Sequence, residues 1–333
     1  MTPRQPSMRV LDEIEFNERL KVLSEGSTRV HFDPFDDIDW DSPAMQFIDN
    51  DPRWILSPHV DPLGTTQWYR NQPPDRQIAI GRWRTMNAYK VGLTFESMLI
   101  RAFMHHLIDL PNNSPEFRYA LHEATEECNH IQMFQEVVNR AGADVPGMRP
   151  VFKALSPLIG LAGGYFKTIA MIGILAGEVP IDHYQKAIIR EGEKVPPAVL
   201  RTMQIHIAEE ARHISFASEW LRRNVPDSNK VLRAGYSLVF PIAMRYLAGQ
   251  IMVPPKSFAR EFGVPDEVFA EAFWQAPESK RLLSGYFGRI RALATELGLM
   301  NPVAKGVWKV LGVDGPSSRY HGEPERIGTR IAV

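Results

Sequence analysis

Two segments of this chain repeat the pattern Glu-Glu-x-x-His 83 positions apart, the first at 126–130 and the second at 209–213. Both lie in long stretches with helical periodicity. On an α-helix, the second Glu and the His of each segment project from one face about one turn apart, so both can reach one cation. The repeat therefore predicts a carboxylate-bridged dinuclear metal site.

Two further carboxylates lie where a four-helix dinuclear site requires them. Such bundles use the Glu-x-x-His pair twice and add one Glu from each of two further helices. Glu96 precedes Glu127 by 31 residues, and Glu178 precedes Glu210 by 32. These separations indicate two helix–turn–helix halves of nearly equal length.

A third histidine extends the candidate site. His206, Glu210 and His213 stand at i, i+4 and i+7, within an arc of about 60° on one helix face, so all three can point at the metals. A lone histidine on a core-facing helix is more often a buried hydrogen-bonding residue, but its neighbours favour ligation here. The candidate metal ligands are Glu96, Glu127, His130, Glu178, His206, Glu210 and His213. We predict no catalytic side chain beyond them.

Four side chains near the ligands are candidates for supporting roles. Glu126 and Glu209 point about 100° away from the ligands that follow them, but each can accept a hydrogen bond from a histidine on a facing helix. A solvated acid is an equal alternative for each. Arg212 is expected to pair with one of these acids. Tyr89 lies two turns before Glu96 and is expected either to line the pocket or to pack in the core.

The ligand types favour iron. Four glutamates supply a charge of −4, which balances two Fe(II) ions, and bridging oxo or hydroxo groups can match the extra charge after oxidation. A mixed imidazole and carboxylate set suits iron or manganese better than zinc, which usually takes four ligands, or copper(I), which favours sulfur. We expect two iron ions, with manganese as the open alternative.

The rest of the chain predicts an all-α fold, because no alternation is long enough to build a sheet. Ser114 and Pro115 mark the N-cap and first position of one helix, and Pro180 is expected to kink or unwind another. The apolar stretch 154–182 is expected to form a buried helical hairpin or kinked helix. The expected helices span about 10–24, 82–110, 115–142, 154–190, 196–225, 229–252, 266–276 and 278–299.

We expect this domain organisation: an N-terminal arm over 1–80 packing on the bundle, a core bundle over 81–225, C-terminal helices over 226–312 completing the same domain, and a loosely ordered tail over 313–333.

Composition limits the function classes. The 333 residues are 44% hydrophobic with a net charge of −1, which gives no global attraction to nucleic acid. No secretory signal is evident at the N-terminus, and Lys167 and Glu178 argue against a membrane span in the most apolar stretch. The single cysteine, Cys128, excludes an intrachain disulfide or a cysteine-ligated cluster within one chain. It is expected to be a small buried hydrophobe, and the chain to be cytoplasmic.

The ligand pattern resembles a known family. Glu96, then Glu127-x-x-His130, Glu178 and His206-x-x-x-Glu210-x-x-His213, is similar to the ligand set of the AurF-like (p-aminobenzoate N-oxygenase) di-iron proteins, which have the extra histidine. The resemblance covers about residues 80–225. The residue before each Glu-x-x-His glutamate is typically Asp in the family and is Glu here, so the contacts around the ligands are expected to differ.

The resemblance implies a ferritin-like bundle, two irons and an oxygenase that activates O2, its co-substrate, through a peroxo-diferric species to oxygenate the nitrogen of an arylamine. One alternative is a di-iron hydroxylase or desaturase acting on an acyl or carrier-bound substrate. Another is a non-enzymatic iron-handling or structural ferritin-like protein, although storage ferritins are much shorter chains.

Expected partners follow from the same residues. The chain lacks a Rossmann glycine fingerprint, so an external electron donor is needed: a reductase, a ferredoxin or a chemical reductant. A small-molecule substrate is expected, with no nucleic acid and no membrane span, and a homodimer is left open.

Overall fold

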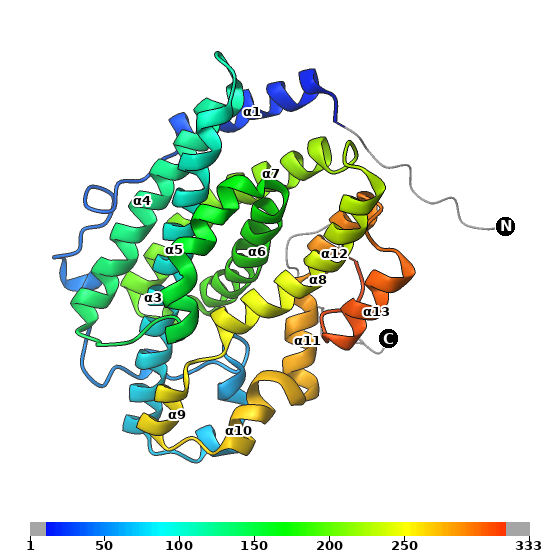
Figure 1. Ribbon diagram of the computed structural model, residues 1–333. Helices are drawn as coiled ribbons and strands as arrows, with labels where there is room; N and C mark the ends of the chain where they lie inside the picture. The colour runs from blue at the N-terminus through cyan, green and yellow to red at the C-terminus, as the bar shows by residue number, and fades with distance from the viewer. Residues whose placement is uncertain (1–10, 318–333) are drawn as a thin grey trace, which may run out of the picture.

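The computed structural model describes residues 11–317 and is built from helices (Figure 1). No strand occurs within that range, so the all-α prediction is confirmed. Parts of the predicted arm (1–10) and tail (318–333) lie outside the described residues. The α-helices are α1 (Glu13–Arg29), α2 (Gln67–Arg70), α3 (Pro74–His106), α4 (Pro115–Ala141), α5 (Pro150–Tyr165), α6 (Lys167–Glu191), α7 (Pro197–Asn224), α8 (Lys230–Met252), α9 (Lys256–Phe262), α10 (Asp266–Ala270), α11 (Pro277–Tyr286), α12 (Gly288–Glu296) and α13 (Pro302–Val310). Shorter turns are the 3-10 helices Pro43–Met45, Pro52–Trp54, Pro62–Thr65, Leu107–Asp109 and Gly192–Lys194 and the π-helix Glu271–Gln275.

Four long helices, α3, α4, α6 and α7, form the central bundle. α3 packs along α4 and α6 packs along α7, so the two halves predicted from the sequence spacing are paired in space. α1 crosses α4 and α7, α5 lies along α3, and α8 lies along α6 (Figure 1). Every helix that carries a predicted ligand is therefore covered by a further helix, which keeps water from the bundle interior.

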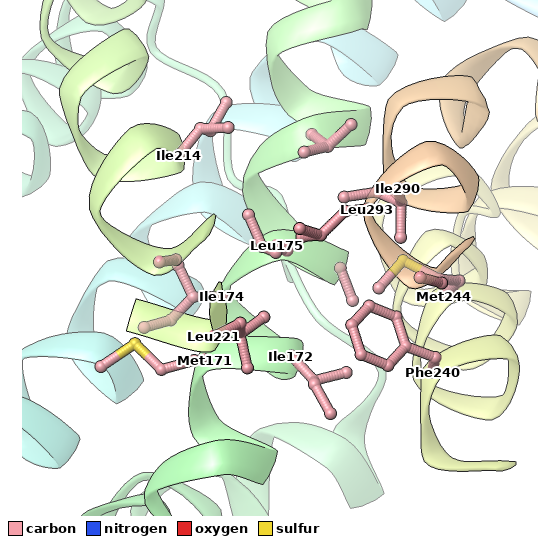
Figure 2. Packing of buried hydrophobic residues seen from close by; sticks show 14 of the residues in the cluster. Met171, Ile172, Ile174, Leu175, Ile214, Leu221, Phe240, Met244, Ile290 and Leu293 are labelled. Atoms are coloured by element: carbon pink, nitrogen blue, oxygen red, sulfur yellow. The ribbon is translucent and has the colours of Figure 1, made fainter. Parts of the chain in front are cut away.

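The apolar interior is divided into two clusters along the bundle. The first joins Leu175 of α6 to Phe240 of α8 and Ile290 of α12, and Figure 2 shows these side chains meeting. The second contains Tyr89 of α3 and Phe134 of α4, with residues of α7 and α9. On α3, α4 and α7 the predicted ligands fall between a stretch of the first cluster and a stretch of the second, whereas on α6 Glu178 lies at the end of the first-cluster stretch 171–179. The polar site is thus enclosed by apolar layers at both ends.

The ends of α4 agree with their sequence signals. Pro115 occupies the first helical position, where its missing N–H costs no hydrogen bond. Ser114 stands at the N-cap, but its side chain makes no capping hydrogen bond, contrary to the expectation from its type. Gly142 ends the helix with φ +60°, a left-handed conformation that glycine adopts without steric cost.

The region 154–190 differs from its prediction. It forms two helices, because the backbone leaves the helical conformation at Phe166 (φ −104°, ψ 62°). α5 is not fully buried: one face packs on α3, while Val151, Leu158 and Tyr165 are 64–74% exposed. α6 runs through Pro180 without interruption, so the expected local unwinding beside Glu178 is absent.

Other helix boundaries also differ from those predicted. α3 begins at Pro74, before the predicted start, and the predicted helix 278–299 is divided at Phe287. The short helices α9 and α13 were not predicted.

Within residues 11–317, one segment, Lys230–Phe262, is long and apolar enough to cross a membrane. It contains α8, which packs against α6 and α13. A core helix of a soluble protein passes the same test, so this is weak evidence for a span.

Candidate metal centre

The seven predicted ligands converge in the middle of the bundle. α3 supplies Glu96, α4 supplies Glu127 and His130, α6 supplies Glu178, and α7 supplies His206, Glu210 and His213. Each of the seven is at most 2% exposed. Helical periodicity accounts for this convergence, since the spacings of three and four residues hold the α4 and α7 donors on the faces turned to one another.

Two glutamates occupy the middle of the cluster. His213 Nδ1 lies 3.0 Å from Glu127 Oε1 and 3.1 Å from Glu210 Oε1. His130 Nδ1 lies 3.0 Å from Glu127 Oε2 and 3.6 Å from Glu210 Oε1. Each of the two carboxylates therefore faces a histidine of both helices.

The remaining ligands lie around this pair. His206 Nε2 is 3.4 Å from Glu96 Oε1 and 3.5 Å from Glu210 Oε1. Donor atoms of Glu96, His130 and His206 lie within 4.8 Å of one another, and so do those of Glu96, Glu127 and Glu178. Such spacing allows three donors to reach one ion.

Unpaired buried oxygens show that the cluster fits a cation. Glu96 Oε2, Glu178 Oε2 and Glu210 Oε2 are buried and accept no hydrogen bond from any described residue. An unpaired buried carboxylate is costly, typically about 1–3 kcal/mol or more when charged. Divalent cations would satisfy these oxygens, and the oxygen and imidazole donors suit iron or manganese.

Each histidine has a partner on the side away from the cluster. His130 Nε2 lies 2.8 Å from Glu209 Oε2, and His213 Nε2 lies 2.7 Å from Glu126 Oε2, both across the bundle. Such outer partners fix the orientation of a metal-binding imidazole and leave its other nitrogen free to ligate. Arg212 Nη2 donates to Glu126 Oε1 at 2.8 Å.

His206 is held by a residue that sequence reasoning missed. Gln185 Oε1 lies 2.9 Å from His206 Nδ1. Its only sequence signal is its place on α6, two turns after Glu178, which does not separate it from other buried amides.

Two other expected residues lie outside the cluster. Tyr89 is buried, and its hydroxyl is 2.6 Å from Thr202 Oγ1, so it packs beneath the site rather than against the ligands. Cys128 is exposed, which corrects the expectation of a buried hydrophobe. It falls on the outer face of α4, between residues that point inward.

The electrostatics divide the carboxyl groups into two kinds. Burial and the neighbouring Glu127 carboxylate raise the pKa of Glu96 well above its usual value. Burial and the Glu210 carboxylate do the same to the pKa of Glu178. Burial alone would also raise the pKa of Glu127, but the facing His213 and His130 hold it well below its usual value. The facing histidines therefore favour the charged form of Glu127, whereas burial and neighbouring carboxylates favour the neutral forms of Glu96 and Glu178.

The histidines differ in the same way. Burial opposes protonation of His130, but hydrogen bonds to Glu127 and Glu209 raise its pKa to about 10. Burial lowers the pKa of His206 to about 3. The raised pKa favours a protonated His130, so ligation through its Nδ1 would have to displace a proton.

Comparison with known proteins agrees with this geometry. A family model described as P-aminobenzoate N-oxygenase AurF matches residues 14–298. The chain belongs to the AurF family. The match extends beyond the stretch 80–225 that carries the ligand resemblance, so α1 and most of the C-terminal helices are part of the family fold as well. AurF membership confirms the ferritin-like di-iron helical fold and the resemblance drawn from the ligand spacing.

Curated relatives span nearly the whole chain. Uncharacterized protein Rv0885 of Mycobacterium tuberculosis (strain H37Rv) and uncharacterized protein Mb0909 of Mycobacterium bovis are each 52% identical over 320 residues, covering 96% of this chain and 94% of the relative. No solved structure matches the chain. AurF is an oxygenase family with a di-iron centre, which supports enzymatic activity, a small-molecule substrate and an external electron donor in general terms.

Proposed function

We propose that this protein is a non-haem di-iron oxygenase that uses O2 to oxygenate the nitrogen of an arylamine. The observation that supports it most directly is the closed cluster of seven buried donors, with His206 as third histidine, in a chain that belongs to the AurF family. We propose Glu96, Glu127, His130, Glu178, His206, Glu210 and His213 as the ligands of the two irons.

The protein's own contribution is placement and exclusion of water. When bound, two irons would supply dioxygen activation and oxygen transfer, with electrons from a separate donor. Glu126, Glu209 and Gln185 hold the three imidazoles in fixed orientations. The apolar clusters at both ends of the site keep solvent from the reacting atoms, which strengthens the electrostatic interactions inside. We expect the protein to act in the cytoplasm.

A cavity at the N-terminal end of α7 is our candidate for substrate entry. It has a volume of about 580 Å³ and is lined by Trp54, Tyr184, Ile188 and Val199, among others. Tyr184 precedes Gln185, the partner of His206, and Val199 lies two turns before His206 on α7. Mainly apolar walls with a few polar groups suit an aromatic ring carrying one polar substituent.

The decisive experiment counts iron after anaerobic Fe(II) loading and removal of excess metal, in wild type and in Glu127→Ala. We expect about two irons per chain in the wild type and a clear loss in the variant. Glu116→Gln is the matched control, because it changes a partly buried acid at the N-terminal end of the same helix, where Glu116 accepts from Trp220. A wild type that retains no iron would contradict the proposal.

Substrate-dependent oxygen consumption then tests the reaction. Loaded, reduced protein is expected to consume O2 faster with arylamines than with acyl substrates. The reverse preference would indicate a hydroxylase or desaturase built on the same metals. Iron loading far above two per chain would indicate an iron-handling protein instead.

A further inference from the structure

A fifth buried glutamate adjoins the candidate ligands. Glu123 of α4 is fully buried, and neither of its carboxylate oxygens has a hydrogen-bond partner among the described residues. Burial is the largest cause that raises its pKa, to about 8, although the nearby His213 lowers it. A buried carboxyl without hydrogen-bond partners is costly to keep, and a cation is the kind of partner that both oxygens could bind.

The position of Glu123 completes the internal repeat. Glu123 precedes Glu127 by four residues and His130 by seven, just as His206 precedes Glu210 by four and His213 by seven. The offset between Glu123 and His206 is the same 83 residues that separate the two Glu-Glu-x-x-His segments. On a helix these spacings put all three side chains on one face, so Glu123 stands on α4 where His206 stands on α7.

In space, His206 and Glu123 each lie beside one histidine of the two Glu-Glu-x-x-His segments. Donor atoms of Glu96, His130 and His206 lie within 4.8 Å of one another. At the other end of the cluster, donor atoms of Glu123, Glu127 and His213 form a second group within the same limit. His206 thus groups with His130, and Glu123 groups with His213, the histidine at the equivalent position of the other half, although Glu127 rather than Glu178 is the third member beside Glu123.

We infer that Glu123 is an eighth metal ligand, bound to the ion that His213 holds. This inference rests on the proposed dinuclear centre and adds to it. One ion would bind the imidazole of His206, and the other would bind the carboxylate of Glu123. Each ion would thus have one donor more than in a site without these two residues, and the two ions would differ in ligand type. The ion beside Glu123 would have the richer oxygen set, which favours a harder cation or a higher oxidation state.

Visible absorption of bound Co(II) tests the assignment directly. Cobalt substitutes for Fe(II) at imidazole and carboxylate sites, and its visible bands gain intensity as the coordination number falls. We expect wild type to bind two Co(II) ions. In Glu123→Leu we expect stronger bands and an affinity for one of the two ions that falls by at least about tenfold, since losing even an outer partner of a ligand costs that much.

Two further variants keep the result interpretable. Glu123→Gln preserves the side-chain shape if the leucine variant fails to fold, and is expected to weaken the same ion. Glu123→His gives α4 the same His-x-x-x-Glu-x-x-His pattern as α7 and is expected to restore affinity with shifted bands. Glu116→Gln, on the same helix, should match wild type.

The outcomes separate this inference from the proposed function. Two Co(II) ions with unchanged affinity and spectrum in both Glu123→Leu and Glu123→Gln would overturn the ligand role and leave the dinuclear centre standing. A wild type that binds no pair of Co(II) ions would overturn both. Weakening of one ion in the Glu123 variants, with the control unchanged, supports both.

Discussion

His130 and Glu209 are joined across the bundle: the imidazole Nε2 on α4 lies 2.8 Å from the carboxylate Oε2 on α7. Nδ1 of the same ring faces Glu127 at 3.0 Å. The ring therefore spans from an outer acid to the centre, and the acid selects which nitrogen is presented inward. Glu209 also accepts from the backbone N–H of Phe32, so the same carboxylate ties the N-terminal segment to the site.

Removing the Glu209 carboxylate should weaken metal binding without removing a proposed ligand. We expect Glu209→Ala to lower affinity for Fe(II) by about 10–100-fold, because the imidazole loses its orienting partner. Glu209→Gln should cost less, since an amide oxygen still accepts from the ring N–H. Competition with a chromophoric chelator measures both. Equal affinities in all three proteins would show that the contact does not orient the ring.

Metal uptake should release protons. His130 has a pKa of about 10 in the metal-free site, so at neutral pH it carries a proton that ligation must expel. Raising the pH towards 10 removes this competition, and each proton released should tighten binding about tenfold per pH unit. Calorimetric titration with Co(II) in buffers of different ionisation enthalpy counts the protons. Binding that is independent of pH between 6 and 8 would contradict the assignment of protons to the cluster.

The side chains around Phe134, which contacts the proposed ligand His206, are closely packed. A Cβ at Gly92 would lie 2.8 Å from Phe134 Cε2, and the Phe134 ring stacks on His206 with centroids 4.9 Å apart. Gly92→Ala should therefore push the ring against His206. Such overpacking costs about 1–3 kcal/mol, which exceeds the gain of about 1 kcal/mol expected from replacing a helical glycine.

Gly173 is the matched control, because a Cβ there meets nothing within 4 Å. Gly173→Ala on α6 should stabilise the protein by up to about 1 kcal/mol. Denaturant unfolding of both metal-free variants measures the difference. Equal stabilisation by both substitutions would show that Phe134 moves aside freely.

Sequence patterns predicted those parts of the structure that depend on helical periodicity. The repeat placed Glu127, His130, Glu210 and His213 on facing surfaces, and the structure brings them together. Their assignment as ligands stays a prediction until metal is measured. Glu123 was missed because a single acid one turn from a ligand resembles any other helical glutamate; only the absence of a partner distinguishes it, and sequence does not show partners.

Features that depend on tertiary packing were harder to predict from the sequence. The division at Phe166 and the exposed face of α5 depend on which surfaces neighbouring helices leave uncovered, and a uniformly apolar stretch has no periodicity to show its buried side. Pro180 was expected to interrupt α6, yet the helix continues through it. Tertiary packing on α7 and α8 supports α6 there, so the local preference is overridden.

Filling the cavity beside α7 should affect substrate binding more than metal binding. Val199 is buried and lines the cavity, about two helical turns from His206. Val199→Trp should raise the KM for an arylamine by about tenfold or more while iron per chain stays at the wild-type value, since the cavity walls contain none of the proposed ligands.

Val199→Ala provides the opposite change, because it enlarges the same cavity. It should leave iron content unchanged and improve turnover of bulkier arylamines relative to smaller ones. If Val199→Trp left KM unaltered with iron fully bound, substrate would have to reach the irons by another route. A loss of iron in Val199→Trp would instead show that the packing of α7 is transmitted to His206, and unfolding measurements on the metal-free variant would separate that effect from general destabilisation.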